Sequence, residues 1–334
     1  MDAPLWTETH APTLSDLPQA SVRDRLTRAV DEPMNLVLQG PQGVGKTAAA
    51  RALARETHED PENDYVEINV ADFFDRTKKE IREDPRFEQF LRGRSRMAKR
   101  DMINRVLKET ASYAPMSGAY RTIVLDNAEA IREDFQQALR RVMEQHHRTT
   151  QFVITTRQPS KLIAPIRSRC FTVPVRVPTA DETAAVLRSI LDAEEVPHDG
   201  DGLEYLVGFA DGDLRKAILG AQATAVEADE VTMSAAHETL RTVGHDDELR
   251  GALRDARTGE FSAARSAVGD LLDDEGYDGQ TLLRELLRVA RREYGGEELA
   301  RLHRLAGAVD LDLAIGTDDR LHLAHLLAEW DTEA

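Results

Sequence analysis

The sequence predicts an α/β fold with a parallel sheet in its N-terminal half, followed by all-helical segments. Up to about residue 176, apolar runs with the character of β-strands alternate with helical stretches, and from residue 178 onward no such run occurs. Strands that alternate with helices are typical of a parallel sheet. The strand runs are residues 35–40, 65–70, 121–126 and 151–156.

A glycine-rich loop follows the first strand run. It matches the phosphate-binding pattern G-x-x-x-x-G-K-[ST] with Gly40, Pro41, Gln42, Gly43, Val44, Gly45, Lys46 and Thr47. In this pattern backbone N–H groups surround phosphate oxygens, the lysine reaches the β and γ phosphates, and the hydroxyl residue contacts Mg²⁺. A helix-forming run at residues 47–54 comes next, so its N-terminal dipole would face the anion. The sequence therefore predicts a nucleotide site in this phosphate loop, residues 40–47.

The strand run at residues 121–126 ends in Asp126. At the carboxyl edge of a parallel sheet, a carboxylate can hold the Mg²⁺ that Thr47 contacts. Asp126 is therefore the expected acidic residue of the metal site. The alternative role is an N-cap for a helix that begins near Glu129, and both roles could hold together.

A basic segment lies between the second and third strand runs. Residues 91–108 hold seven basic residues and one acid, Asp101, which gives a local charge of +6. One interpretation is contact with a polyanion, because arginine and lysine bind phosphates, and the other is a solvated helix face or a flexible arm. The candidate contacts are Arg94, Arg96, Lys99, Arg100, Arg105 and Lys108.

Helical periodicity dominates the rest of the chain. The runs at 184–193, 203–210 and 214–223 predict a small helical domain, and the amphipathic runs at 281–294 and 320–330 predict a helical bundle. We therefore expect three domains, which are residues 1–176, 177–242 and 243–334.

The whole chain is strongly acidic. Its 334 residues include 60 acidic and 43 basic side chains, of which only seven are lysine, and the formal net charge is −17. Such a composition suits a cytoplasm so salty that fields are screened within about 3 Å at ~1 M, which points to a halophilic source. An ordinary acidic protein is the alternative, and net charge alone argues against a nucleic-acid partner.

Several classes of protein are excluded by composition. A single cysteine, Cys170, cannot form an internal disulfide or a cysteine-based zinc cluster. No apolar run approaches the ~18 residues of a membrane span, and the first residues lack the basic and then apolar pattern of a signal peptide. We therefore expect a cytoplasmic protein with no membrane partner.

Six motifs spread over nearly the whole chain carry a family resemblance. They are LWTETHAPTLSDL, GPQGVGKT, FQQALRRVMEQ, APIRSRC, GDLRKAI and AVDLDLAIGTDDRLHLAHLL. With them the sequence resembles the AAA+ ATPases and, among these, the small subunits of replication factor C, the sliding-clamp loader. The resemblance implies a RecA-like ATPase domain, a helical lid and an all-α collar that joins five related subunits. It also implies ATP and Mg²⁺ as cofactors, and the other subunits, the sliding clamp and primer-template DNA as partners.

The resemblance assigns roles to two arginines. Arg169 in the SRC tripeptide matches the arginine finger that acts in trans on the γ-phosphate of a neighbouring subunit. Arg215 in GDLR matches the lid arginine that contacts nucleotide in its own subunit. A guanidinium suits both roles because its donors form a fixed fork and its charge is permanent. Salt bridges to the many carboxylates of the chain are the alternative for each.

Two departures from the family pattern bear on hydrolysis. Asn127 stands where the family has the catalytic glutamate, and an amide can orient water but cannot take its proton. Arg157 falls at the polar position called sensor 1. Loss of a general base costs roughly 10² to 10⁴ in rate, so we expect ATP binding with weak or no hydrolysis at this site.

Two alternatives to that expectation stay open. The first is a fully competent ATPase subunit of the same complex, in which Glu129 or a group from a neighbouring chain replaces the base. The second is an AAA+ protein with another DNA-remodelling task.

The resemblance also bears on the basic segment, because in the family this region faces DNA. Asn104 and Val106 match common DNA contacts, with Arg100, Arg105 and Lys108 adjacent. Any such binding should be directed at phosphates and not at sequence.

Overall fold

The computed structural model describes residues 4–70, 76–83, 97–112, 115, 120–273, 277–316 and 318–330. They fall into two compact units, Met1–Ala236 and His237–Ala334, and each is described by itself.

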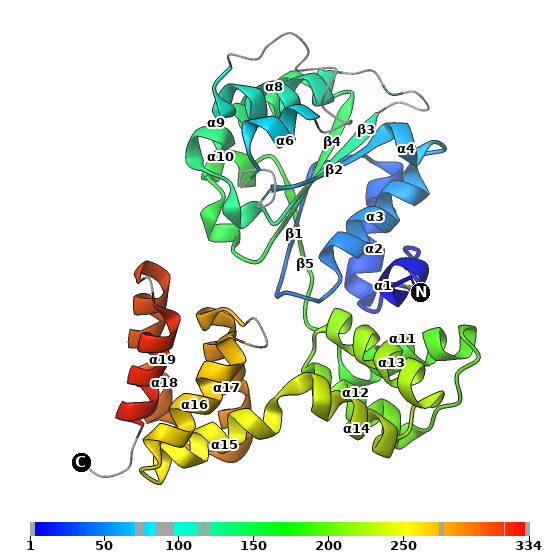
Figure 1. Cartoon of the computed structure of the whole chain (residues 1–334). Coiled ribbons are helices and arrows are strands. Elements are labelled where there is room, and N and C mark those ends of the chain that lie inside the picture. The colour runs from blue at the N-terminus through cyan, green and yellow to red at the C-terminus, as the bar shows by residue number, and fades with distance from the viewer. Residues whose placement is uncertain are drawn as a thin grey trace. The chain divides into compact units, whose positions relative to one another are not determined.

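A five-stranded parallel sheet forms the centre of the N-terminal unit, as Figure 1 shows. The strand order is β2-β3-β4-β1-β5. The four strand runs in the sequence are all strands of this sheet, so the predicted α/β fold is confirmed. The strands are β1 (Leu36–Gln39), β2 (Tyr65–Asn69), β3 (Arg121–Asp126), β4 (Thr150–Thr156) and β5 (Phe171–Pro174).

Helices cover both faces of the sheet. Alternate residues of each strand point to opposite faces, so Leu36 and Leu38 of β1 pack into one core and Val37 into the other. The first core includes α2 and α3, and the second includes α6, α8 and α9, in agreement with their places in Figure 1. The helical elements before residue 176 are α1 (Trp6–Thr9), α2 (Ala20–Asp31), α3 (Lys46–Thr57), α4 (Pro61–Asp64), α6 (Lys78–Glu83), α8 (Lys99–Ser112), the 3₁₀ turns Ala128–Ala130 and Pro159–Lys161, α9 (Glu133–Gln145) and α10 (Ala164–Arg167).

Among the described residues, helices follow the sheet. They are α11 (Ala180–Ala193), α12 (Gly200–Ala210) and α13 (Leu214–Ala228), and then α14 (Met233–Gly244), which begins in this unit and continues past its end at Ala236. Thr179 and Glu182 form a reciprocal capping box that begins α11. The backbone N–H of Leu214 donates to the Gly43 carbonyl at 3.1 Å, so α13 begins against the phosphate loop. The division of the chain into three domains stays a prediction.

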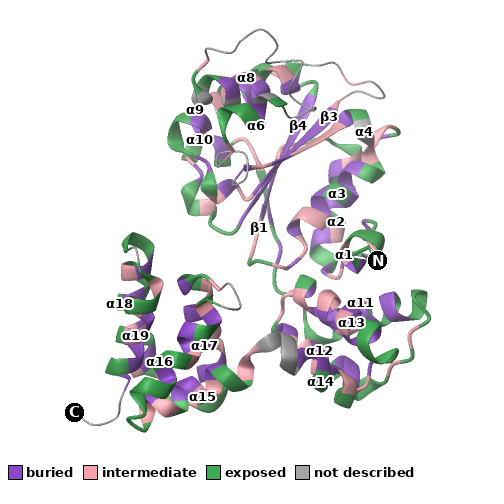
Figure 2. Cartoon of the chain, viewed as in Figure 1, coloured by how far each residue is buried: buried purple, intermediate pink, exposed green. Residues whose placement is uncertain are grey.

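The C-terminal unit is all-helical, as expected. Its helices are α15 (Asp246–Arg257), α16 (Phe261–Asp273), α17 (Gly279–Glu293), α18 (Gly296–Ile315) and α19 (Asp319–Glu329). Their buried faces, purple in Figure 2, meet in one apolar core that includes Leu253, Leu286 and Leu326. Within the residues that the structure describes, no helix has both the length and the apolar character that a membrane span requires.

Candidate functional site

The phosphate loop has a backbone conformation that strongly favours glycine at two positions. Gly43 and Gly45 have φ angles of +72° and +94°, in the left-handed region. A Cβ on Gly43 would also lie 2.0 Å from the Asp213 carboxyl group, and one on Gly40 would lie 2.0 Å from the Val175 carbonyl oxygen. The absence of side chains at these positions leaves the backbone open to a phosphate at the start of α3, as predicted for a nucleotide.

Lys46 lies at the first position of α3 and is largely buried. Its Nζ donates to the Gly40 carbonyl at 2.9 Å and also to the Pro41 carbonyl. Burial lowers the pKa of Lys46, although the carboxylates of Glu129 and Asp126 act in the opposite direction. The ammonium thus lies inside the loop on neutral acceptors, and an anionic phosphate oxygen would be a stronger partner for it.

Thr47 and Asp126 meet at the carboxyl edge of the sheet. The Thr47 hydroxyl donates to Asp126 Oδ1 at 2.8 Å, and the hydroxyl of Thr155 on β4 donates to the same oxygen. Asp126 is buried, with 8 % of its surface exposed. A hydroxyl beside a carboxylate offers the oxygen ligands that Mg²⁺ prefers, so these two residues fit a metal site next to the phosphate loop.

The alternative role of Asp126 as a helix cap is wrong. The 3₁₀ turn Ala128–Ala130 follows Asn127, no side chain caps it, and the next helix begins only at Glu133. Asp126 is the last residue of β3, and its carboxylate accepts hydrogen bonds from the hydroxyls of Thr47 and Thr155.

Asn127 lies directly beside that carboxylate. Its backbone is left-handed, with φ of 56°, a conformation that asparagine tolerates better than most residues. Its Nδ2 is 3.4 Å from Asn69 Oδ1 and 3.5 Å from Asp126 Oδ2. The side chain at this position is therefore a neutral amide held between two oxygens, and it carries no group that can take up a proton.

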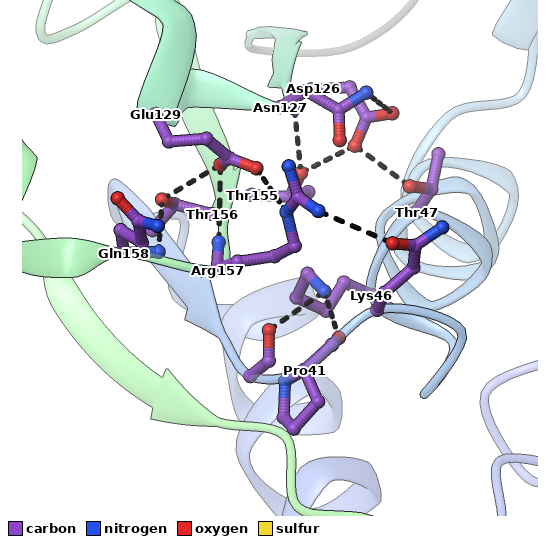
Figure 3. A network of polar contacts seen from close by, with 12 residues as sticks. Pro41, Lys46, Thr47, Asp126, Asn127, Glu129, Thr155, Thr156, Arg157 and Gln158 are labelled. Carbon is purple, nitrogen blue, oxygen red and sulfur yellow. Dashed lines mark hydrogen bonds and ion pairs between the residues drawn. The ribbon is translucent and has the colours of Figure 1, made fainter. Parts of the chain in front are cut away.

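Glu129 and Arg157 form an ion pair across the ends of β3 and β4, shown in Figure 3. Arg157 Nε donates to Glu129 Oε1 at 2.6 Å, and the Arg157 backbone N–H donates to Oε2 at 3.1 Å. The Thr156 hydroxyl donates to the same Oε2 at 3.0 Å. Burial raises the pKa of Glu129, but these hydrogen bonds outweigh it, so the pKa lies below its usual value.

This pairing weakens one of the alternatives for hydrolysis. A carboxylate with a lowered pKa and three donors on its two oxygens is a poor general base. The ion pair therefore disfavours Glu129 as the base that the resemblance led us to expect near position 127.

Arg169 follows α10 and forms an ion pair within its own chain. Its Nη2 lies 2.5 Å from Glu144 Oε1, and its Nη1 donates to the Pro165 carbonyl at 2.7 Å. The salt bridge that the sequence offered as the alternative to an arginine finger therefore exists in the single chain. A third of the Arg169 side chain remains exposed. Its neighbour Cys170 packs against the core, and burial raises the pKa of the thiol to about 12, which makes it unreactive.

Arg215 is the second residue of α13 and is exposed. Among the described residues its guanidinium has no hydrogen-bond or ion-pair partner. Asp213, which no sequence motif singled out for a role, caps α13 through the Lys216 N–H at 2.9 Å and lies against Gly43. Arg215 thus lies two residues from an acid that packs on the phosphate loop.

The basic segment is described only in part. Arg94 and Arg96 lie outside the described residues, and so do the side chains of Lys99 and Arg100, which begin α8. Arg105 forms an ion pair with Glu109 at 2.9 Å, and Lys108 is exposed.

The expectation that Val106 matches a DNA contact is wrong. Val106 is completely buried, because this side of α8 packs in the second core of the sheet.

Comparison with known proteins finds two family models. Residues 19–179 match a model described as DNA polymerase III, delta subunit, and residues 244–329 match the replication factor C C-terminal domain.

Similar proteins match over nearly the full chain. The replication factor C small subunit of Natronomonas pharaonis is 34 % identical, with 97 % of this chain and 94 % of that protein covered. The replication factor C small subunit of Halobacterium salinarum is 32 % identical, with 97 % of this chain and 95 % of that protein covered.

Among solved structures, the RuvB Holliday junction branch migration motor of Thermotoga maritima has a TM-score of 0.53 at 16 % identity. The structural match covers 76 % of this chain and 84 % of the RuvB chain. A likeness at this identity concerns the AAA+ fold alone.

Proposed function

Because the chain belongs to the replication factor C small-subunit family, we propose that it is an ATP-binding subunit of a clamp loader that helps to place a sliding clamp on primed DNA. The observation that carries this proposal is the meeting of the phosphate loop with the Thr47 and Asp126 pair at the carboxyl edge of the sheet. That geometry fits a nucleoside triphosphate with its metal ion.

In this proposal, different residues of the site bind the phosphates of ATP and the Mg²⁺ ion. Backbone N–H groups of the phosphate loop and the Lys46 ammonium would bind the phosphates, while Thr47 and Asp126 would hold Mg²⁺, whose charge would offset that of the phosphates. Arg215 at the start of α13 adds a guanidinium from the lid. Asn127 can orient a water molecule without taking its proton, so we propose that hydrolysis at this site is weak.

Lys46→Ala should weaken ATP binding by about tenfold or more, because it removes the charge that meets the β and γ phosphates. Titration of the full chain with a fluorescent ATP analogue measures this. Lys79→Ala, which removes a lysine of α6 outside the phosphate loop, is the matched control. Unchanged affinity in folded Lys46→Ala would mean that the phosphates do not bind this loop.

The partners follow from the family. We propose that the chain assembles with other replication factor C subunits into a hetero-oligomer, which in this family is a pentamer, and that Arg169 reaches the nucleotide of a neighbour. Copurification with the sliding clamp and the other subunits tests this assembly, with copies counted by native mass spectrometry from a high-salt preparation. Its failure would favour another AAA+ remodelling task.

The basic segment is the proposed DNA contact, because it concentrates positive charge in an acidic chain. Replacing Arg94, Arg96, Lys99 and Arg100 with serine should lower the affinity of the assembled complex for primed DNA. It should also flatten the slope of log affinity against log salt, because DNA binding releases fewer counterions when the protein makes fewer phosphate contacts.

A matched control replaces with serine four exposed arginines of α17 and α18 in the C-terminal unit, Arg284, Arg291, Arg292 and Arg304, which lie outside the basic segment. Equal slopes for the serine variant and the parent would identify the basic segment as solvated surface.

A further inference from the structure

Asn35, the residue before β1, holds the chain on both sides of Cys170. Its backbone carbonyl accepts a hydrogen bond from the Phe171 N–H at 2.7 Å, and its side-chain Nδ2 donates to the Arg169 carbonyl at 3.4 Å. Cys170 itself packs against the second core of the sheet. The backbone of Arg169 is therefore tied to the start of β1, which lies next to β5 in the sheet (Figure 1).

The side-chain amide of Asn35 is oriented by β4. Its Oδ1 accepts a hydrogen bond from the Phe152 N–H of that strand at 2.9 Å. An N–H group requires an acceptor, so this contact assigns the amide oxygen to β4 and the amide nitrogen to Arg169. Because β1 lies between β4 and β5, one side chain joins an inner strand of the sheet to the residue that matches the arginine finger.

The side chain of Arg169 is held less firmly than its backbone. Arg169 is 33 % exposed and its partner Glu144 is 40 % exposed, and ion pairs on the surface contribute little to stability. The phosphates of a neighbour's nucleotide offer charged oxygens in greater number, so they can draw the guanidinium away from Glu144. The Arg169 backbone then decides where the guanidinium lies, and a misplacement of about 1 Å can cost about 100-fold in rate.

We propose that Asn35 is a positioning residue for Arg169, which fixes the backbone of the finger so that its guanidinium meets the nucleotide of the neighbouring subunit. The inference rests on the proposed role of Arg169 in trans. Asn35 lies at the opposite end of β1 from the phosphate loop, so its effect on hydrolysis passes through Arg169 and not through the nucleotide site of its own chain.

The test measures ATP turnover of complexes assembled from identical partners and stimulated by DNA and clamp. Asn35→Asp keeps an acceptor for the Phe152 N–H but replaces the donor to the Arg169 carbonyl with an oxygen, which that carbonyl repels. We expect it to lower the part of kcat that depends on Arg169 by about 10- to 100-fold, with little change in the KM for ATP or in the ATP affinity of the isolated chain. Asn35→Leu removes both side-chain contacts without adding a charge and should cause a similar loss.

Gln151→Met is the matched control, because the Gln151 side chain also donates to a backbone carbonyl beside β1, that of Met34, at 3.1 Å. Among the described residues, the polar partners of this side chain are Met34 and Thr122, so the change does not touch Arg169. It should lower the free energy of unfolding and leave the turnover of intact complexes unchanged.

The decisive comparison is the double change Asn35→Asp with Arg169→Ala. If Asn35 acts through Arg169, the double variant should turn over ATP no more slowly than Arg169→Ala alone, whereas a general structural defect would slow both backgrounds equally. An equal loss in both backgrounds, normal turnover in assembled Asn35→Asp and Asn35→Leu complexes, or failure of both variants to assemble would overturn the inference. Failure of the proposed finger is distinguishable, because Arg169→Ala would then itself be silent, and the role of Asn35 would fall with it.

Discussion

Arg169→Ala should lower ATP turnover at the neighbouring subunit's site by about 10³- to 10⁵-fold, or about 4 to 7 kcal/mol of barrier. The side chain is one-third exposed, and among the described residues two of its nitrogens have partners, Glu144 and Pro165. The planar guanidinium of Arg169 has further N–H donors that can stabilise the charge that develops on a transferring phosphoryl group. ATP affinity of the isolated chain should stay nearly unchanged, because Arg169 is not part of its own phosphate site.

The measurement compares Arg169→Ala with Lys46→Ala in complexes assembled from identical partners and stimulated by DNA and clamp. We expect Arg169→Ala to lower total turnover more than Lys46→Ala, because a site without its base has little turnover to lose. Arg167→Ala, an exposed arginine on α10, is the matched control. The integrity of each complex is checked first, since either change could loosen the interface.

The opposite pattern would contradict this account. If Arg169→Ala is silent and Lys46→Ala abolishes turnover, the chain hydrolyses ATP in its own right, and the ion pair with Glu144 is the whole role of Arg169.

Local pattern predicted the fold better than it predicted contacts between elements. The runs that form β1, β3 and β4 have buried residues in succession, as parallel strands covered on both faces require. The run that forms β2 lies at the sheet edge, and only Ile68 of that strand is buried. The short strand β5 was missed because it lies at the sheet edge and buries only Val173 of its four residues, so it leaves no apolar run.

The candidate site was predictable where its residues share a motif or end a strand. The phosphate loop is contiguous, and Asp126 was placed by the rule that parallel strands end at one edge. The pairing of Glu129 with Arg157 depends on β3 and β4 being neighbours in the sheet. That neighbour relation is a property of the strand order, which no local spacing of residues encodes.

The same reason explains why the partner of Arg169 was not identified. Glu144 belongs to α9, and the polar pair forms only because α10 packs against that helix. The sequence indicated that salt bridges were an alternative for Arg169, and the fold selects one carboxylate among 60 acidic residues.

Asn127→Glu should raise ATP turnover of the assembled complex by up to about 100-fold at this site, because a carboxylate beside the metal position can accept the proton of the attacking water. The gain is limited by two features of the site. A glutamate must adopt the left-handed backbone of Asn127, at a cost of about 1 kcal/mol. It would also lie next to the Asp126 carboxylate, which opposes a second negative charge.

Asn127→Gln isolates the effect of the new carboxylate, because glutamine has the same size and the same backbone strain but no group that can take a proton. We therefore expect Asn127→Glu to turn over ATP much faster than Asn127→Gln at equal ATP occupancy and equal assembly. If Asn127→Glu and Asn127→Gln have the same steady-state rate while ATP binding is intact, the missing base is not what makes this site slow.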